Sequence, residues 1–295
     1  MSCRKRPGIT VLFIDVETSG LDPRRNVILS LGACLARHHP AGAGPVDLAV
    51  FEDQLVYDPR LDLEGAVDEQ ALEVNGLDLD HVRAEGLPPE RAMNLLKGWL
   101  LDVLRPGDLV DVRGEPRHIL GGQNFGCFDY PFLMAWREHY GVELPRHSRR
   151  FVDTATLLHL LRTTAAIPPD VVSLAQFIEA GFAGDYLKPH SAADDAQASA
   201  MVFRRATLVS AHVWALGATI DEARSASGCP EGTHLSFHLR RQADRLHRFE
   251  QMFPDPTELQ TVATLTQNIR IAESMLFELG IPDGTTDEKT EDDAS

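Results

Sequence analysis

The sequence predicts an α/β domain in which helices cover a mixed β-sheet. Three apolar, β-rich runs come first, and further strand-like runs then alternate with helical patterns. Strands followed by strands mixed with helices indicate a mixed sheet with helices packed on it. The chain has 295 residues, of which 43% are hydrophobic, so it can bury the core that such a domain needs.

Three runs predict the first strands of the sheet. Residues 8–15 form a short apolar run that ends in an acid, residues 26–37 form a longer β-rich run, and residues 46–57 alternate apolar and polar side chains. Alternation with a period of two is typical of a strand with one buried face. We therefore expect three strands before the first helix.

Helices and two further strands are expected after these runs. Pro89 has the fixed φ that suits the first turn of a helix, which supports a helix at that position. The expected helices cover 68–74, 89–104, 128–139 and 194–216, and the expected strands cover 118–122 and about 150–153, the latter followed by more helices.

The character of the sequence changes beyond residue 218. A linker-like segment, 221–234, precedes apolar residues at helical spacing. A helix start at 255–258 then leads into a heptad of apolar residues from Val262 to Leu279. This pattern predicts a helical hairpin packed on the core, with self-association into a homodimer through the heptad face as the alternative. The predicted organisation is a core domain over 1–217, a helical extension over 218–282 and a disordered acidic tail over 283–295.

Charge limits how this protein could bind nucleic acid. Lys and Arg total 28 against 44 Asp and Glu, which gives a net charge of −16. Because proteins that wrap duplex DNA carry basic surfaces, a histone-like grip is disfavoured. Carboxylates that hold metal ions can still bring an acidic protein to phosphate groups.

Cysteine usage and hydropathy favour a cytoplasmic location. The four cysteines, Cys3, Cys34, Cys127 and Cys229, include no CxxC pair, which argues against a disulfide framework or a structural zinc site. No run approaches the ~18 consecutive apolar residues of a membrane span, and the basic start leads straight into a strand-like run without a cleavage site. We therefore expect no membrane segment and no secretory signal.

Asp15 and Glu17 form the first candidate group for chemistry. Residues i and i+2 of a strand project to the same face, so the two carboxylates would converge. Desolvated carboxylates repel each other, and a divalent cation removes that cost. The turn that follows, 18–23, can bring backbone close to a ligand. Taken alone, such an acid pair is more often an ordinary surface feature.

Two later clusters also carry acids next to predicted helix starts. Asp129 follows a polar strand end, and it could instead cap the next helix. His190 precedes Asp194 and Asp195, and these two acids could simply favour the N-terminus of the long helix. The order and spacing of the three clusters make one shared site the better interpretation.

The segments FIDVETSGLD, GGQNFGCFDY and HSAADDAQA resemble the three motifs of the DEDDh (DnaQ-like) 3′–5′ exonucleases. These motifs are Asp-x-Glu-Thr-x-Gly, an Asn-containing stretch that ends in Phe-Asp, and a His followed five residues later by an Asp. The resemblance covers about residues 10–215. It implies a ribonuclease-H-like fold, in which helices flank a five-stranded mixed sheet with an antiparallel second strand.

The resemblance also implies the roles of the acids and the histidine. Asp15, Glu17, Asp129 and Asp195 would hold two Mg²⁺ or Mn²⁺ ions, and His190 would be the general base that takes a proton from the attacking water. Hard divalent ions prefer carboxylate oxygens, and two ions can stabilise the attacking and the leaving oxygen of an in-line displacement. An imidazole takes up protons near neutral pH, which suits a general base. Asp194 is the alternative ligand to Asp195, and the spacing from His190 favours Asp195.

Substrate-binding residues follow from the same resemblance. The backbone of Thr18, Ser19 and Gly20 resembles the seat of the 3′-terminal nucleotide. Leu21 matches the apolar wedge against the terminal base, which fits sequence-tolerant binding of single strands. Asn124 matches the asparagine of the second motif, although it lies five residues before the acid rather than the usual four. Oligoribonucleases share that longer spacing.

The expected function is metal-dependent removal of nucleotides from the 3′ end of single-stranded DNA or RNA, with release of nucleoside 5′-monophosphates. The nearest alternative is an oligoribonuclease-like enzyme that acts on very short RNAs. An alternative from another class is a catalytically silent nucleic-acid-binding or scaffolding relative, and the presence of all the motif acids and the histidine argues against it. The motifs do not choose between DNA and RNA.

Partners other than a nucleic acid with a free 3′ end are only faintly indicated. Residues 273–277 resemble a sliding-clamp-binding peptide, which would suit a polymerase-associated role, but Leu276 belongs to the heptad. Four arginines on the extension form either a solvated face or a guide for nucleic acid, and they are Arg240, Arg241, Arg245 and Arg248.

Overall fold

The computed structural model describes residues 9–38, 47–105, 118–163, 166–184 and 187–207. Apart from 166 and 167, the described residues up to 206 belong to one compact unit, which contains all the motif residues. The predicted linker, heptad helices, arginine face, clamp-like peptide and acidic tail lie outside the described residues, as do Cys3 and Cys229.

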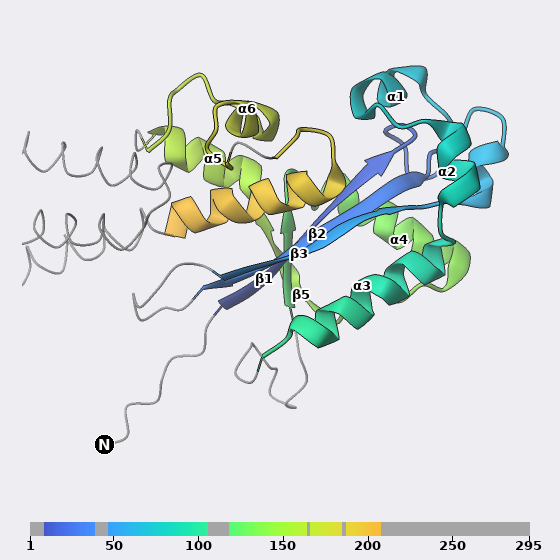
Figure 1. The fold of residues 1–295 in the computed structure, drawn as a ribbon, viewed down its shortest axis with the longest axis horizontal. Helices are drawn as coiled ribbons and strands as arrows, with labels where there is room; N and C mark the ends of the chain where they lie inside the picture. Colours follow the sequence, from blue (N-terminus) through green and yellow to red (C-terminus); the bar gives the residue numbers. More distant parts are fainter. Residues whose placement is uncertain (1–8, 39–46, 106–117, 164–165, 185–186, 208–295) are drawn as a thin grey trace, which may run out of the picture. The chain divides into compact units, whose positions relative to one another are not determined.

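The core of this unit is a five-stranded sheet in the order β3-β2-β1-β4-β5 (Figure 1). The strands are β1 (Ile9–Thr18), β2 (Ile28–His38), β3 (Asp47–Leu55), β4 (His118–Gly122) and β5 (His147–Asp153). β2 pairs antiparallel with both β1 and β3, whereas β4 pairs parallel with β1 and with β5. β2 therefore runs against the other strands. The mixed sheet and its antiparallel second strand confirm the predicted ribonuclease-H-like α/β fold.

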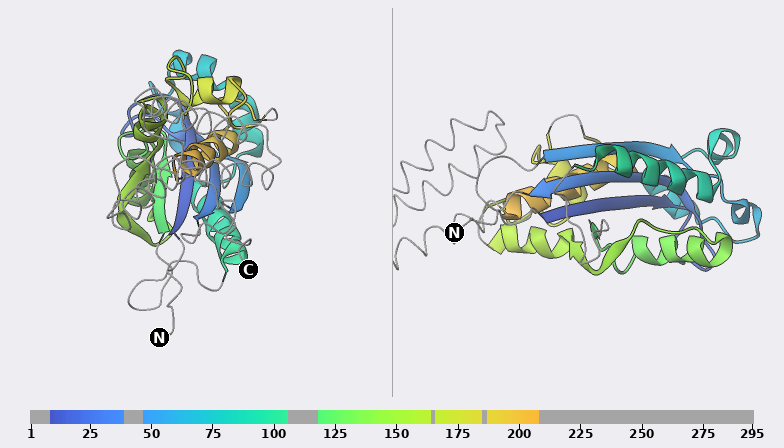
Figure 2. Two further views of the ribbon diagram at one scale, coloured as in Figure 1. Left: turned by 90° about the vertical axis from the view of Figure 1, so that its left-hand side faces the viewer. Right: turned by 90° about the horizontal axis from the view of Figure 1, so that it is seen from below.

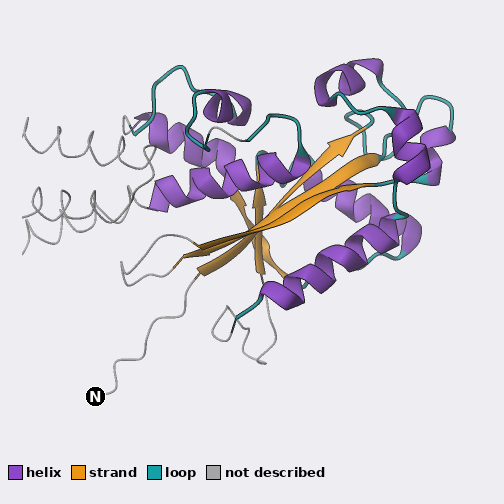
Figure 3. Cartoon of the chain, in the orientation of Figure 1, coloured by secondary structure: helices purple, strands orange, loops and turns teal. Residues whose placement is uncertain are grey.

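Helices flank the sheet, as Figure 2 and Figure 3 show from three directions. They are the 3₁₀ turn η1 (Pro59–Asp62), α1 (Glu69–Asn75), α2 (Leu79–Glu85), α3 (Pro89–Val103), α4 (Asp129–Tyr140), α5 (Thr154–Thr163) and α6 (Leu174–Glu179). A further helix covers 192–207 among the described residues. None of the helices in this described part of the chain is long and apolar enough to cross a membrane.

Side-chain alternation along β1 gives the sheet its two buried faces. Leu12, Ile14 and Val16 pack in one cluster with residues of α3 and α4. Val11 and Phe13 pack in another, with Ala196, Ala200 and Phe203 of the helix over 192–207. Because successive side chains of a strand point to opposite faces, Asp15 and Glu17 continue the second of these faces. They therefore point to the side on which the last described helix lies.

Several boundaries differ from the sequence prediction, and β2, for example, begins at Ile28 rather than at residue 26. β1 extends to Thr18 rather than ending at residue 15, so Glu17 lies inside the strand. β5 begins at His147 rather than near residue 150, because its first residue pairs with His118 of β4. The last described helix begins at residue 192 rather than 194.

The short helix α2 was not predicted from the sequence. This helix has 7 residues and buries only Val82, so it shows no extended apolar periodicity. Asp78 caps it, since its side chain accepts a hydrogen bond from the backbone N–H of Asp80. A cap and one apolar contact are enough to fix such a short helix within a folded domain.

Candidate active site

The start of the helix over 192–207 lies directly on the sheet beside Asp15. Asp15 pairs with Gly32 across β1 and β2. A Cβ atom at Gly32 would overlap the backbone of Ala192 and Ala193, so only glycine permits this close approach. The close contact brings Asp195, in the first turn of that helix, to the strand face that carries Asp15 and Glu17.

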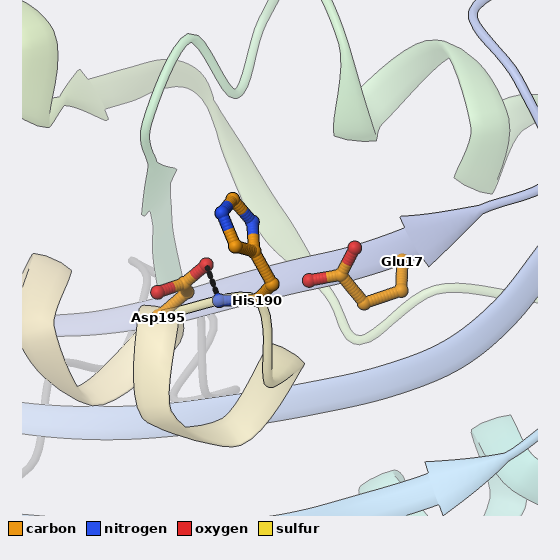
Figure 4. A group of neighbouring side chains, drawn as sticks. All are labelled: Glu17, His190 and Asp195. Atoms are coloured by element: carbon orange, nitrogen blue, oxygen red, sulfur yellow. Dashed lines mark hydrogen bonds between the residues drawn. The ribbon is translucent and has the colours of Figure 1, made fainter. Parts of the chain in front are cut away.

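Glu17, His190 and Asp195 converge on one point (Figure 4). One ligand atom from each of these side chains lies within 4.8 Å of the others. Carboxylate oxygens and an imidazole nitrogen at this spacing could hold a divalent metal ion. The predicted convergence of the first and third motifs is therefore present in the folded chain.

His190 adopts an unusual backbone conformation. Its φ is 66°, in the left-handed region that non-glycine residues seldom occupy. Its backbone N–H donates a hydrogen bond of 3.2 Å to Oδ2 of Asp195, which holds this conformation (Figure 4). Strained residues of this kind persist where the surrounding structure fixes them, often at functional sites.

Asp129 points toward β1 and does not serve as the cap of α4. It is the first residue of that helix, and the N-cap position belongs to Phe128, which has no capping side chain. The Asp129 side chain is only 1% exposed, and its Oδ1 accepts a hydrogen bond of 3.1 Å from the backbone N–H of Val16. Because Val16 lies between Asp15 and Glu17, this bond ties the second motif to the first.

Burial first, and then mutual repulsion, raises the pKa values of the four carboxylates predicted to bind metal. Burial, followed by the charges of Asp129, Asp195 and Glu17, raises the pKa of Asp15 well above its usual range. Burial and the Asp195 charge raise the pKa of Glu17 to about 7. Burial also raises the pKa of Asp129 to about 8, although the Val16 N–H opposes the shift. The pKa of Asp195 rises to about 7 through burial, against the opposing His190 N–H, with Asp194 and Asp53 adding to the shift.

Among the described residues, two buried carboxylate oxygens in this cluster have no hydrogen-bond donor, which favours a cation bound beside them. Within the described part of the chain, Asp129 Oδ2 and Asp195 Oδ1 are buried and accept no hydrogen bond. A buried anionic oxygen without a partner is costly, and a bound cation removes that cost. The donors are mainly carboxylate oxygens, which suit hard ions such as Mg²⁺ and Mn²⁺. The residues present therefore fit a divalent metal ion.

Asp194 has a different environment from Asp195. Its Oδ2 accepts a hydrogen bond of 2.9 Å from the backbone N–H of Lys188, in the segment before His190. The converging group contains Asp195 rather than Asp194. The geometry thus agrees with the spacing argument for Asp195.

The turn after Glu17 is fixed by its own polar groups. The hydroxyl of Ser19 donates to the carbonyl of Ala66 at 2.6 Å and accepts from the N–H of Val27 at 2.9 Å. The Thr18 hydroxyl donates to the Gly20 carbonyl at 2.7 Å. Thr18 and Ser19 are buried, so their side chains stabilise the turn rather than face the solvent. Gly20 is also buried, and a Cβ there would overlap the side chain of Asn26.

Leu21 lies at the exposed end of this turn. Its side chain is 77% exposed, the largest value among the exposed apolar side chains of the described residues. The Asn75 side chain donates to the Thr18 carbonyl at 3.0 Å, and the Asp68 N–H donates to the Ser19 carbonyl at 2.7 Å. These contacts from α1 and its cap brace the turn that presents Leu21. Neither Asn75 nor Asp68 was identified from the sequence, because hydrogen bonds to backbone carbonyls follow no local sequence pattern.

Asn124 shapes the turn between β4 and α4. Its φ is 54°, which asparagine tolerates better than most residues. Its carbonyl accepts from the N–H groups of Cys127 and Phe128, and its own N–H donates to Asp153 at 3.3 Å. Asn124 is exposed, and the turn that it forms leads directly to Asp129.

The known proteins to which this chain is similar have the names of nucleases. No protein-family model matches the chain. The chain is 29% identical over 198 residues to Ribonuclease T of Haemophilus influenzae (strain PittGG), a match that covers 66% of this chain and 78% of that protein. It is 29% identical over 209 residues to Ribonuclease T of Hahella chejuensis (strain KCTC 2396), covering 68% of this chain and 84% of that protein.

A shorter match, 31% identical over 97 residues, is with the 3′-5′ DNA exonuclease Cap18 of Escherichia coli, and it covers 33% of this chain and 45% of that protein. The names of these relatives support the interpretation of the chain as a DnaQ-like exonuclease. They also support the expectation, drawn from the motifs, that the chain is a hydrolytic enzyme rather than a silent relative.

Proposed function

We propose that this protein is a divalent-metal-dependent 3′–5′ exonuclease of the DEDDh type, acting on single-stranded DNA or RNA and releasing nucleoside 5′-monophosphates. The observation that carries the proposal is the convergence of Glu17, His190 and Asp195 within 4.8 Å. Asp15 and Asp129 join them through the charge interactions that raise their pKa values. The proposed active site thus combines all the motif acids with the motif histidine.

The four carboxylates would hold two Mg²⁺ or Mn²⁺ ions, through Asp15, Glu17, Asp129 and Asp195. When bound, such ions supply Lewis-acid stabilisation of the charge that develops on the phosphate oxygens. The orphaned oxygens Asp129 Oδ2 and Asp195 Oδ1 support this assignment.

His190 would be the general base. Its imidazole would accept a proton from the water that attacks the terminal phosphorus. The bond from phosphorus to the O3′ atom of the preceding nucleotide would break, and that oxygen would take up a proton from solvent to become the new 3′ hydroxyl. The terminal nucleotide would leave as a 5′-monophosphate. Because His190 is exposed, the proton can pass on to solvent before the next cycle.

The turn after Glu17 would seat the 3′-terminal nucleotide. The braced backbone of Thr18 to Gly20 would lie against the sugar, and exposed Leu21 would pack against the terminal base. An apolar contact to a base face is tolerant of sequence. The names of the relatives include both a ribonuclease and a DNA exonuclease, so both polymers are kept as substrates.

The longer spacing between Asn124 and Asp129 favours a second candidate, an oligoribonuclease-like enzyme on very short RNAs. We also propose that the core extends over 1–217, that 218–282 forms a helical cover or a homodimer contact, and that the protein is cytoplasmic. These assignments rest on the sequence pattern alone.

The test is digestion of matched single-stranded DNA and RNA oligomers of several lengths, labelled at the 5′ end, with Mg²⁺ or Mn²⁺. A ladder that shortens one nucleotide at a time from the 3′ end is expected. Hydrolysis confined to RNAs of a few nucleotides would favour the second candidate. Cleavage of a circular single strand would overturn the exonuclease assignment, because a circle has no 3′ end.

A further inference from the structure

Asp53 joins the edge strand β3 to the segment between His190 and Asp195. Its Oδ2 accepts a hydrogen bond of 2.7 Å from the hydroxyl of Ser191. Its Oδ1 accepts one of 2.6 Å from the backbone N–H of Ala193. Both carboxylate oxygens are therefore used by a segment that is 138 to 140 positions away in the sequence. No motif contains Asp53.

A β-bulge explains how an edge-strand side chain reaches this segment. Leu31 of β2 pairs with Gln54, and Ala33 pairs with Phe51, so Glu52 and Asp53 together face Gly32. Two residues opposite one is the pattern of a β-bulge, which bends a strand and redirects a side chain. Gly32 is also where the start of the last described helix rests on the sheet. The bulge thus places Asp53 beside that helix start.

The segment that Asp53 holds connects the proposed base to a proposed metal ligand. The Ser191 carbonyl accepts a hydrogen bond of 2.8 Å from the N–H of Asp195. The N–H of His190 in turn donates to Oδ2 of Asp195 at 3.2 Å. Fixing Ser191 and Ala193 against β3 therefore fixes the turn from which both functional side chains project.

We infer that Asp53 is a positioning residue, which holds His190 and Asp195 in the geometry needed for hydrolysis through its hydrogen bonds to Ser191 and Ala193. This inference rests on the proposed function. Asp53 acts through the helix start, and it is not among the three residues whose ligand atoms converge within 4.8 Å of one another. Its charge adds to the repulsion that raises the pKa of Glu17 and Asp195. The two hydrogen bonds of Asp53 fix the helix start even though its charge is unfavourable beside these acids.

Asp53 is exposed, so its replacement removes little buried contact from the core. Asp53→Ala removes both hydrogen bonds, and Ser191→Ala removes one of them. Asp53→Asn removes the charge but can keep both contacts, because the amide oxygen accepts from Ala193 and the amide N–H₂ can donate to the Ser191 hydroxyl. Glu52→Ala is the matched control, since Glu52 is an exposed acid on the same strand.

The readouts are kcat and KM on a labelled single-stranded oligomer, and the rise in Tm that Mn²⁺ causes in each variant. For Asp53→Ala we expect kcat to fall about 10- to 100-fold, the loss expected when catalytic groups shift by up to about 1 Å. KM should change little. The Mn²⁺ concentration that gives half of the Tm rise should increase. Ser191→Ala should change kcat and the Mn²⁺ response in the same direction by less, Asp53→Asn should recover most of the loss, and Glu52→Ala should match the unmodified protein.

Three outcomes would overturn the inference. The first is an Asp53→Ala protein with unchanged kcat and Mn²⁺ response. The second is an equal loss in Glu52→Ala, which would indicate a general charge effect. The third is an Asp53→Asn protein as impaired as Asp53→Ala, which would indicate a role for the charge itself. If Asp53→Ala fails to fold, Ser191→Ala and Asp53→Asn decide the matter.

The proposed function and the positioning role fail in different ways. An unmodified protein that hydrolyses none of the oligomers with Mn²⁺ would contradict the proposed function. The Mn²⁺-dependent Tm rise would still report on the geometry of the carboxylate cluster. If that rise is the same in Asp53→Ala and the unmodified protein, the positioning role fails independently of activity.

Discussion

The backbone N–H of Val16 donates a hydrogen bond of 3.1 Å to Oδ1 of Asp129. This bond joins the strand that carries Asp15 and Glu17 to the first residue of α4. It leaves Oδ2 of Asp129 buried without a hydrogen-bond partner in the described part of the chain. One oxygen therefore sets the position of the side chain, and the other remains available to a cation.

The carboxylate cluster predicts that hydrolysis requires a divalent ion. Excess EDTA should abolish nucleotide release, and Mg²⁺ or Mn²⁺ added beyond the EDTA concentration should restore it, because these ions suit the oxygen donors present. The measurement is the rate at which a 5′-labelled oligomer shortens. EDTA already saturated with Mg²⁺ is the control and should have no effect. Full activity in excess EDTA would exclude a metal-dependent site.

The exposed imidazole of His190 predicts a selective loss of kcat. His190→Ala should lower kcat by about 10²–10⁴-fold, the usual contribution of a general base, while KM changes little. His159→Ala is the control, since His159 is an exposed histidine on α5. Steady-state kinetics on one oligomer measures both variants. Equal kcat values for His190→Ala and the control would remove the base assignment.

The motif spacing predicted much of this site, and the reason is geometric. A separation of two places Asp15 and Glu17 on one strand face whatever the rest of the fold does. The sequence interpretation also brought Asp129 and Asp195 to the same point through the resemblance. In the folded chain Asp195 converges with Glu17 and His190, and Asp129 accepts a hydrogen bond from Val16, between Asp15 and Glu17.

The contacts that hold the site were not predictable in the same way. Asp53 bonds to Ser191 from a β-bulge opposite Gly32. Asn75 reaches the Thr18 carbonyl across 57 positions. Such contacts depend on which backbone groups tertiary packing leaves unpaired, and no local pattern records that. The short helix α2 was missed for a related reason, since packing rather than periodicity stabilises it.

The raised pKa values predict that the metal-free protein loses stability as pH rises. A carboxyl whose pKa is higher in the folded than in the unfolded chain stabilises the fold while protonated, and that stability is lost as pH rises through the folded value. The pKa of Glu17 and Asp195 rises to about 7 and that of Asp129 to about 8. Tm in EDTA should therefore fall between pH 5 and 8, a window taken from these values.

Asp129→Asn tests this electrostatic origin. The amide keeps an oxygen for the Val16 N–H but carries no charge. In EDTA at pH 8 its Tm should be higher than that of the unmodified protein, by about 2–4 °C for each kcal/mol of repulsion relieved. Its activity with Mn²⁺ should fall about 10²-fold or more, because a charge-stabilising group is lost. A lower Tm at pH 8, or full activity, would contradict the assignment.

The exposed Leu21 predicts a substitution that weakens substrate binding without affecting the fold. The side chain is 77% exposed, so Leu21→Ser should leave Tm unchanged, as surface substitutions usually do. Loss of the apolar contact with the terminal base should raise KM for single strands by up to about 10- to 150-fold, given the ~1.5–3 kcal/mol that full burial of a leucine side chain contributes. The rise should be the same for strands of different length, because only the 3′-terminal nucleotide is affected. Leu101→Ser is the control, since Leu101 is 70% exposed on α3. An unchanged KM for Leu21→Ser, or an equal rise in the control, would show that the terminal base does not pack on this turn.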